Sequence, residues 1–255
     1  MVTFISDLDN TLIYSRKPGN SCVEWYGDRE ITYMTTKAYD TFTSLLLEDG
    51  FIFIPCTARS FKQASRVSFI GSNIPKYMVC DMGASIYIDG VRSVEWYNYL
   101  KKLGVLDESR VENFKNIVEN RLDLFKCRKI ISNDNYFLVY AFGNREDAEK
   151  FYIDLCEEYV DNFFRYRLQG RKVYVCPVGL NKVLAVEWLK ESLDLGTVIT
   201  SGDSMFDEFF VAEGDIAYLP SHSDFIVEDA IVMENDSIFS GEDIVMSVSN
   251  IVRGY

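Results

Sequence analysis

The sequence predicts an α/β protein: a Rossmann-like, three-layer core built on a parallel sheet, with a second, α+β domain inserted into it. Near both ends of the chain, short apolar runs alternate with helical patterns, which is the order of parallel strands joined by crossover helices. The middle of the chain carries paired strand-like runs and helices, as in an antiparallel sheet covered on one face. A length of 255 residues is near the upper limit for one hydrophobic core, which also favours a core with a smaller insertion.

The first part of the chain alternates strand and helix. Residues 2–6 are β-branched and aromatic and stop at Asp7, and residues 51–55 form a continuous apolar run, as expected of a strand buried on both faces. A helical pattern over 35–48 ends at Gly50. The expected elements are strands 2–6, 51–55 and 77–80 and helices 35–48 and 64–69.

The middle of the chain begins with a hairpin pattern around Asp89-Gly90. The expected elements there are strands 84–88, 91–96, 129–132, 136–142 and 171–176 and helices 108–122 and 146–159. The alternation then resumes with helices 182–193 and 207–212 and strands 198–200 and 216–219. We therefore expect a core of residues 1–84 and 178–255 and an inserted domain of residues 85–177.

The charge balance restricts the partners of the protein. The chain has 26 Lys and Arg against 39 Asp and Glu, a net charge of −13. Nucleic acids and anionic membranes bind basic surfaces, so neither is expected as a partner. An anionic substrate would need a bound cation or a locally positive pocket.

Cysteine usage and the absence of apolar segments predict a soluble, cytoplasmic protein. The six cysteines are scattered without a Cys-x-x-Cys pair, and reduced thiols are the simplest account. With His222 as the single histidine, expected in a loop rather than in catalysis, a zinc site is not predicted. The N-terminus does not read as a secretory signal, and no run approaches the roughly 18 apolar residues of a membrane span. Nothing in the sequence predicts an oligomeric state.

The first candidate site is Ser-Asp-Leu-Asp-Asn-Thr, in which Asp7 and Asp9 directly follow the first strand. Ligands of open parallel sheets bind beyond the carboxyl ends of the strands, where this loop is expected. Two carboxylates at this spacing point the same way in an extended chain and could form a hard oxygen site with Mg²⁺. A polar turn after a strand would show the same residues.

Three further motifs follow strands or begin helices. Thr57, in Cys-Thr-Ala-Arg-Ser, offers a hydroxyl and nearby amides for phosphate, and Arg59 offers a fork of donors, although a helix cap would look the same. Lys182 lies at a helix start, where the helix dipole disfavours a cation unless a carboxylate or phosphate is near. In Ser-Gly-Asp-Ser-Met-Phe-Asp, Asp203 and Asp207 either cap a helix or bind a metal and orient Lys182.

Taken in order, these motifs resemble those of the haloacid dehalogenase superfamily of aspartyl-nucleophile phosphatases. The superfamily order is Asp-x-Asp-x-Thr, then Thr or Ser, then Lys, then Gly-Asp-x-x-x-Asp, and all four are present over about residues 1–84 and 178–255. The insertion resembles that of the branch with a large α+β cap, which includes Cof-type hydrolases and sucrose-phosphate phosphatase. Two positions depart from the pattern: Phe206 stands where many members have Asn, and Met82 replaces the first residue of Asn-Gly-Ala.

The resemblance implies a mechanism. Asp7 would attack phosphorus and form an aspartyl-phosphate, and Asp9 would protonate the leaving alkoxide and then deprotonate the hydrolytic water. Mg²⁺ would be held by Asp7, the Asp9 carbonyl and Asp203. The phosphate would be bound by Asn10, Thr57, Ala58 and Lys182. The supporting residues would be Thr11, Arg59, Gly202, Ser204 and Asp207.

The expected function is therefore a magnesium-dependent phosphomonoester hydrolase acting on a small phosphorylated metabolite, such as a sugar phosphate. A phosphomutase would use the same intermediate but return the phosphoryl group to another hydroxyl, so net phosphate release separates the two. A non-catalytic phosphate-binding module on the same fold is a third reading.

Overall fold

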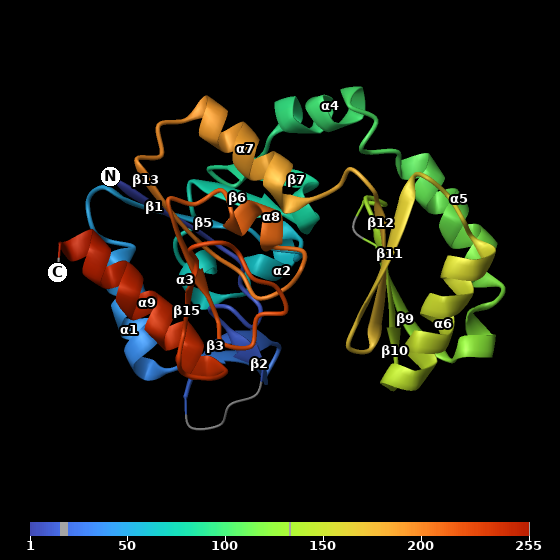
Figure 1. Ribbon diagram of the computed structural model, residues 1–255, viewed down its shortest axis with the longest axis horizontal. Coiled ribbons are helices and arrows are strands. Elements are labelled where there is room, and N and C mark those ends of the chain that lie inside the picture. The colour runs from blue at the N-terminus through green and yellow to red at the C-terminus, as the bar shows by residue number, and fades with distance from the viewer. Residues whose placement is uncertain (16–19, 133, 255) are drawn as a thin grey trace. The chain divides into compact units, whose positions relative to one another are not determined.

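The computed structural model describes residues 1–15, 20–132 and 134–254. The chain forms two compact units, which we call the core unit (Met1–Ser93 with Asn181–Tyr255) and the inserted unit (Val94–Leu180) (Figure 1). Residues 85–93, predicted as the start of the insertion, belong to the core unit, and residues 178–180 belong to the inserted unit.

The core unit is built on a five-stranded parallel sheet. Its strand order is β15-β14-β13-β1-β5. The strands are β1 (Val2–Ser6), β5 (Phe51–Pro55), β13 (Thr197–Ser201), β14 (Ile216–Leu219) and β15 (Ile231–Val232). Strand β1 lies between β13 and β5: its residue Phe4 pairs with both Ile199 and Phe53, and both faces of the strand are buried. The sheet confirms the predicted fold class.

Helices cover both faces of this sheet. Figure 1 shows α7 (Lys182–Ser192) on one side and α1 (Thr36–Leu45) and α9 (Ile238–Arg253) on the other. Phe42 of α1 and Val248 of α9 share one apolar cluster with Phe4. The helix α9 was not predicted from the sequence, and the single helix expected over 64–69 is two short ones, α2 (Phe61–Ala64) and α3 (Ser68–Gly71). Between β13 and β14 lies α8 (Glu208–Val211).

Two small antiparallel sheets complete the core unit. One has the order β6-β7-β8, with β6 (Tyr77–Cys80), a 3-10 turn η1 (Asp81–Gly83), β7 (Ser85–Ile88) and β8 (Val91–Arg92). The other, with the order β2-β4-β3, was not predicted. It comprises β2 (Tyr14–Ser15), β3 (Ser21–Tyr26) and β4 (Arg29–Met34), and β3 and β4 are joined by a tight turn at Gly27, whose φ is 61°.

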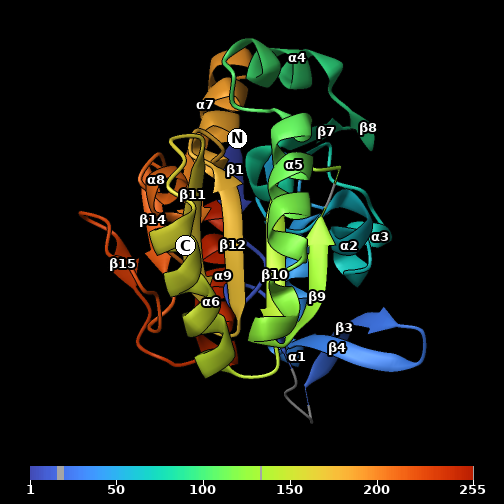
Figure 2. The same ribbon diagram turned by 90° about the vertical axis from the view of Figure 1, so that its right-hand side faces the viewer.

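The inserted unit is an antiparallel sheet with helices on one face. Its strand order is β11-β12-β10-β9, and Figure 2 shows α5 and α6 side by side over the sheet. Phe114 of α5 and Phe151 of α6 pack with Tyr140 of β10 in one apolar cluster. The elements are α4 (Val94–Lys102), α5 (Glu108–Glu119), η2 (Leu122–Phe125), β9 (Cys127–Ser132), β10 (Leu138–Phe142), α6 (Arg145–Glu158), β11 (Phe164–Gln169) and β12 (Lys172–Pro177).

Two sequence predictions for this region were wrong. The strand expected over 91–96 ends at Arg92, because Trp96 and Leu100, four residues apart, are buried along one face of a helix that begins at Val94. Strand β11, at the edge of the sheet, was missed although its Phe-Arg-Tyr-Arg-Leu-Gln run alternates apolar with polar residues, which is the pattern of a half-buried strand. Within the described residues, no helix is both long and apolar enough to cross a membrane.

Candidate active site

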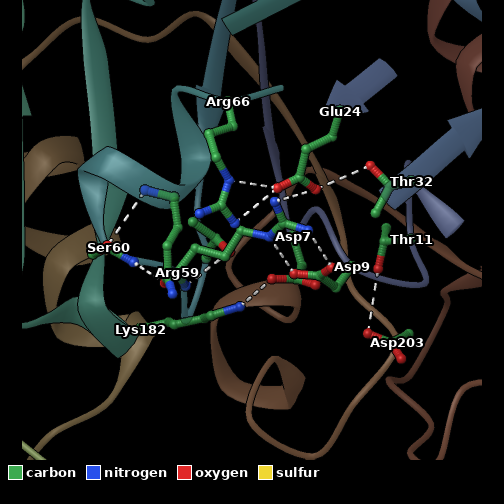
Figure 3. Close-up of polar contacts among 12 residues, drawn as sticks. Asp7, Asp9, Thr11, Glu24, Thr32, Arg59, Ser60, Arg66, Lys182 and Asp203 are labelled. Carbon is green, nitrogen blue, oxygen red and sulfur yellow. Dashed lines mark hydrogen bonds and ion pairs between the residues drawn. The ribbon is translucent and has the colours of Figure 1, made fainter. Parts of the chain in front are cut away.

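Four sequence motifs meet at the carboxyl ends of the parallel strands. Asp7 follows β1, Thr57 follows β5 and Asp203 follows β13, while Lys182 is the first residue of α7. Figure 3 shows Asp7, Lys182 and Asp203 in the same small region with Asp9 and Arg59. Because β1 lies between its two parallel neighbours β13 and β5, the loops that follow these three strands emerge side by side.

A buried ammonium links two buried carboxylates. Lys182 Nζ donates to Asp7 Oδ1 at 2.6 Å and to Asp207 Oδ1 at 2.6 Å. The three residues are 2%, 6% and 0% exposed, respectively. Burial lowers the pKa of Lys182, but the nearby carboxylates of Asp207 and Asp7 together raise it by a larger amount. The net shift of the pKa is upward, so the ammonium stays charged. The two carboxylates offset the unfavourable position of this cation at a helix start.

Asp207 is fixed by the loop that precedes it. Its Oδ2 accepts hydrogen bonds from the amides of Asp203 (3.2 Å) and Ser204 (3.0 Å) and from the Ser204 hydroxyl (3.1 Å). A Cβ at Gly202 would lie far inside van der Waals contact with the Asp207 side chain, so this approach requires glycine. Asp207 directly precedes α8, but its side chain makes no capping hydrogen bond to that helix. It holds Lys182 and the loop of residues 203–204 in place instead.

The approach of Lys182 also depends on Gly83. Gly83 has φ +93°, and a Cβ there would overlap the carbonyl oxygen of Asn181. Asn181 caps α7 by accepting the Leu184 amide at 3.0 Å, one residue before Lys182. Next to it, Met82 lies in left-handed backbone at φ 60°, a conformation in which Asn is enriched. Met82, which replaces the Asn of the superfamily pattern, therefore occupies a position with left-handed backbone.

The donor set fits a divalent cation. Asp7, Asp203 and Asp207 each offer a carboxylate oxygen, and these oxygens lie within 4.8 Å of one another. When all three carboxylates are ionised, Lys182 balances one of their charges, and a cation can balance the other two. Burial, followed by Asp7 and Asp207, raises the pKa of Asp203 to about 9. Burial also raises the pKa of Asp7 to about 7, despite the opposing effect of Lys182. Hard oxygen ligands of this kind suit Mg²⁺.

The loop after Asp7 is a tight turn. The amides of Leu12 and Ile13 both donate to the carbonyl of Leu8, at 3.0 and 2.9 Å, and Asn10 has φ 58°. The Asn10 amide donates to Ile13 O at 2.8 Å, which occupies the donor that the sequence assigned to phosphate.

Side chains on either side hold this loop. The Thr11 hydroxyl donates to Asp203 Oδ1 at 3.5 Å, and His222 Nε2 lies 2.9 Å from the Asn10 carbonyl oxygen. His222 itself lies in a turn after β14, as expected from the sequence, and it contacts the loop after Asp7 through the Asn10 carbonyl oxygen.

Thr57 and Ala58 lie at the end of β5. Thr57 is buried, its amide donates to Val79 O at 2.9 Å, and its hydroxyl oxygen accepts from the Arg59 amide at 3.2 Å. That contact uses the hydroxyl as an acceptor, so its hydrogen can still be donated to a ligand. Ala58 is half-buried beside it.

The Asp9 carboxylate is bound by Arg59. Arg59 Nε donates to Asp9 Oδ2 and Arg59 Nη2 to Asp9 Oδ1, both at 2.7 Å. Arg59 Nη1 donates at 2.9 Å to Glu24, a residue that sequence reasoning missed. The sequence carried a signal for the hairpin but not for the burial of Glu24: Tyr-Gly-Asp-Arg between two β-prone runs is typical of a hairpin turn.

The parallel sheet, the insertion and the cluster of Asp7, Lys182, Asp203 and Asp207 define a phosphatase of the haloacid dehalogenase superfamily. Over residues 1–217 the chain matches the family model described as Sucrose-6F-phosphate phosphohydrolase, and it belongs to that family. No curated protein matches the chain.

Solved structures share the fold over nearly the whole chain. A trehalose-6-phosphate phosphatase related protein is 18% identical with a TM-score of 0.65, covering 99% of this chain and 100% of its own. The sucrose-phosphatase from Synechocystis, solved with sucrose and phosphate, is 16% identical with a TM-score of 0.61, at 96% and 97% coverage. The C-terminal domain of C. albicans trehalose-6-phosphate phosphatase is 13% identical with a TM-score of 0.69, at 98% and 93% coverage.

Proposed function

We propose that the protein is a magnesium-dependent sugar-phosphate phosphatase that works through an aspartyl-phosphate on Asp7. The observation that carries this proposal is the buried Asp7–Lys182–Asp207 cluster beside Asp203, at the sheet edge where ligands of parallel α/β proteins bind.

In the first step, an oxygen of the Asp7 carboxylate attacks phosphorus and the bond from phosphorus to the sugar oxygen breaks. Asp7 Oδ1 is bound to Lys182, so we assign the attack to Oδ2. Asp9 gives a proton to the leaving oxygen. In the second step, Asp9 removes a proton from water, whose oxygen attacks phosphorus. The bond to Asp7 then breaks, releasing phosphate and restoring the carboxylate.

Protein groups and a cation share the negative charge of the phosphoryl group. Lys182 and the hydroxyl of Thr57 are the candidate donors to phosphoryl oxygens. Asp7 and Asp203, with the carbonyl of Asp9, would hold Mg²⁺, which when bound lowers the charge repulsion between the phosphate and the carboxylates. Asp207 is already bound by Lys182, Asp203 and Ser204, so it supports the site and is not a principal ligand.

The substrate class comes from the family. The family description and the names of the similar structures refer to phosphates of sucrose and trehalose. We propose that the leaving group is a sugar hydroxyl and that the inserted unit selects it, as a closing cap that excludes water would.

The test is phosphate release from sucrose 6-phosphate, trehalose 6-phosphate, hexose phosphates and p-nitrophenyl phosphate, with Mg²⁺ or with EDTA. Asp7→Asn should abolish release, while Asp40→Asn, on the exposed face of α1, should leave it unchanged. Acid quenching during turnover should trap a phosphoryl adduct on the peptide that contains Asp7. Release that survives in Asp7→Asn would refute the mechanism. Isomerised sugar phosphate without phosphate release would indicate a phosphomutase.

A further inference from the structure

Glu24 is a carboxylate with no exposed surface on the β3–β4 hairpin. A buried charge is strongly unfavourable unless other groups neutralise and hydrogen-bond it. Here Oε2 accepts from Arg59 Nη1 at 2.9 Å and from the Thr32 hydroxyl at 3.2 Å, and Oε1 accepts from Arg66 Nε at 2.9 Å. Figure 3 shows Glu24 between Arg66 and Arg59, with Asp9 beyond Arg59.

The backbone of β3 is shaped to bury this side chain. Val23 and Glu24 are consecutive and both are fully buried, although neighbouring residues of a regular strand point to opposite faces. The register of β3 against β4 shifts on both sides of Glu24, and Glu24 makes an isolated bridge with Val67. Bulges re-aim side chains, so the distortion of this strand turns Glu24 toward Arg59.

All three nitrogens of the Arg59 guanidinium are used. Nε and Nη2 form a fork on the two oxygens of Asp9, and Nη1 binds Glu24. A guanidinium is planar, so fixing Nη1 fixes the plane and direction of the fork. Glu24 therefore acts on Asp9 through Arg59.

Asp9 needs such support because packing does not hold it. Its side chain is 49% exposed, whereas that of Arg59 is 13% exposed. A carboxylate has about four lone-pair positions, so the two hydrogen bonds of the fork do not by themselves saturate it. The fork from Arg59 thus fixes the orientation of the Asp9 carboxylate.

We propose that Glu24 and Arg59 are positioning residues that hold the carboxylate of Asp9 in place for proton transfer to and from the substrate. This inference rests on the proposed role of Asp9 as the proton donor to the leaving group.

The expected signature depends on the leaving group. A sugar alkoxide is a poor leaving group and needs a placed proton, whereas p-nitrophenolate leaves without one. General acid catalysis contributes about 10²–10⁴-fold, so Glu24→Gln should lower kcat/KM for a hexose phosphate about tenfold or more. For p-nitrophenyl phosphate the loss should stay below about threefold. We use kcat/KM because it reports the steps up to release of the first product.

Arg66→Gln is the matched control. Arg66 contacts the same Glu24 carboxylate at 2.9 Å, and no contact between Arg66 and Asp9 is observed among the described residues. It should lower the melting temperature, as loss of a charged partner does, and leave the ratio of the two kcat/KM values unchanged. Arg59→Lys keeps the charge but loses the fork, so it should change the ratio as Glu24→Gln does. It also serves if Glu24→Gln does not fold.

The double variant Asp9→Asn/Glu24→Gln completes the experiment. If Glu24 acts through Asp9, adding Glu24→Gln to Asp9→Asn should cause no further loss. An unchanged ratio in folded Glu24→Gln or Arg59→Lys, with Asp9→Asn strongly impaired on the hexose phosphate, would overturn this inference alone. Full activity of Asp9→Asn on the hexose phosphate would overturn the proposed role of Asp9 instead.

Discussion

Replacing Lys182 with Met should destabilise the protein strongly, because Lys182 is the cation between two buried carboxylates. Removing one partner of a buried ion pair costs about 3–5 kcal/mol, since it leaves the other charge buried without compensation. Here two carboxylates, both 2.6 Å from Nζ, lose the same partner. For a chain of this size, about 2–4 °C is lost per kcal/mol, so the melting temperature should fall by roughly 6–20 °C.

Lys190→Met is the control for this prediction. Lys190 lies on the same helix α7 and pairs with Glu213 at 2.9 Å, but its side chain is 35% exposed. An exposed pair contributes about 0–1 kcal/mol, so this variant should melt within a few degrees of the wild type. Equal losses in the two variants would refute the reasoning from burial.

The loss in Lys182→Met should also depend on pH. Without metal the pKa of Asp7 is about 7, so at pH 5.5 Asp7 is mostly protonated and its attraction to Lys182 is already weak. The difference in melting temperature between wild type and variant should therefore be smaller at pH 5.5 than at pH 8.5. Thermal unfolding followed by circular dichroism in EDTA measures both differences.

Two further predictions concern the metal and the backbone. Because the pKa values of Asp7 and Asp203 are raised to about 7 and 9, the metal-free folded protein keeps protons that the unfolded chain releases above about pH 4. The stability of the metal-free protein should therefore fall as pH rises from about 4 to 9. Removing Mg²⁺ should lower the melting temperature more at pH 9 than at pH 6. Equal losses of melting temperature at the two pH values would contradict the assignment of these carboxylates to the metal. Gly83→Ala should cost more stability in urea unfolding than Gly90→Ala, which shares a positive φ (+75°) but whose nearest neighbour would be 3.6 Å from the new Cβ.

The sequence predicted the parallel core and the order of its site residues because both depend on local signals. Apolar runs such as Phe51–Pro55 mark strands of the parallel sheet, and polar residues that follow these strands gather at one sheet edge. The position of Lys182 at a helix start was itself informative, since only nearby negative charge explains it; Asp7 and Asp207 supply that charge.

The features that escaped prediction depend on distant contacts. Glu24 in a β-prone run reads as a solvent-facing residue, and its burial follows from Arg59 and Arg66, which lie more than thirty residues further along the chain. In α4, the run from Val94 favours a strand by propensity, but the packing of Trp96 and Leu100 on one side makes it helical. The use of the Asn10 amide within its own loop could not be read from residue types at all.

The buried carboxylate on the β3–β4 hairpin limits how this protein can be recombined with its relatives. A hairpin at the surface, joined to the core by its ends, looks like a module that could be exchanged between family members. Exchanging it for one without a carboxylate at position 24 would leave the guanidinium groups of Arg59 and Arg66 without the anion that lies between them. Chimeras should therefore transfer Glu24, Arg59 and Arg66 as one inherited unit, although they belong to two separate stretches of the chain.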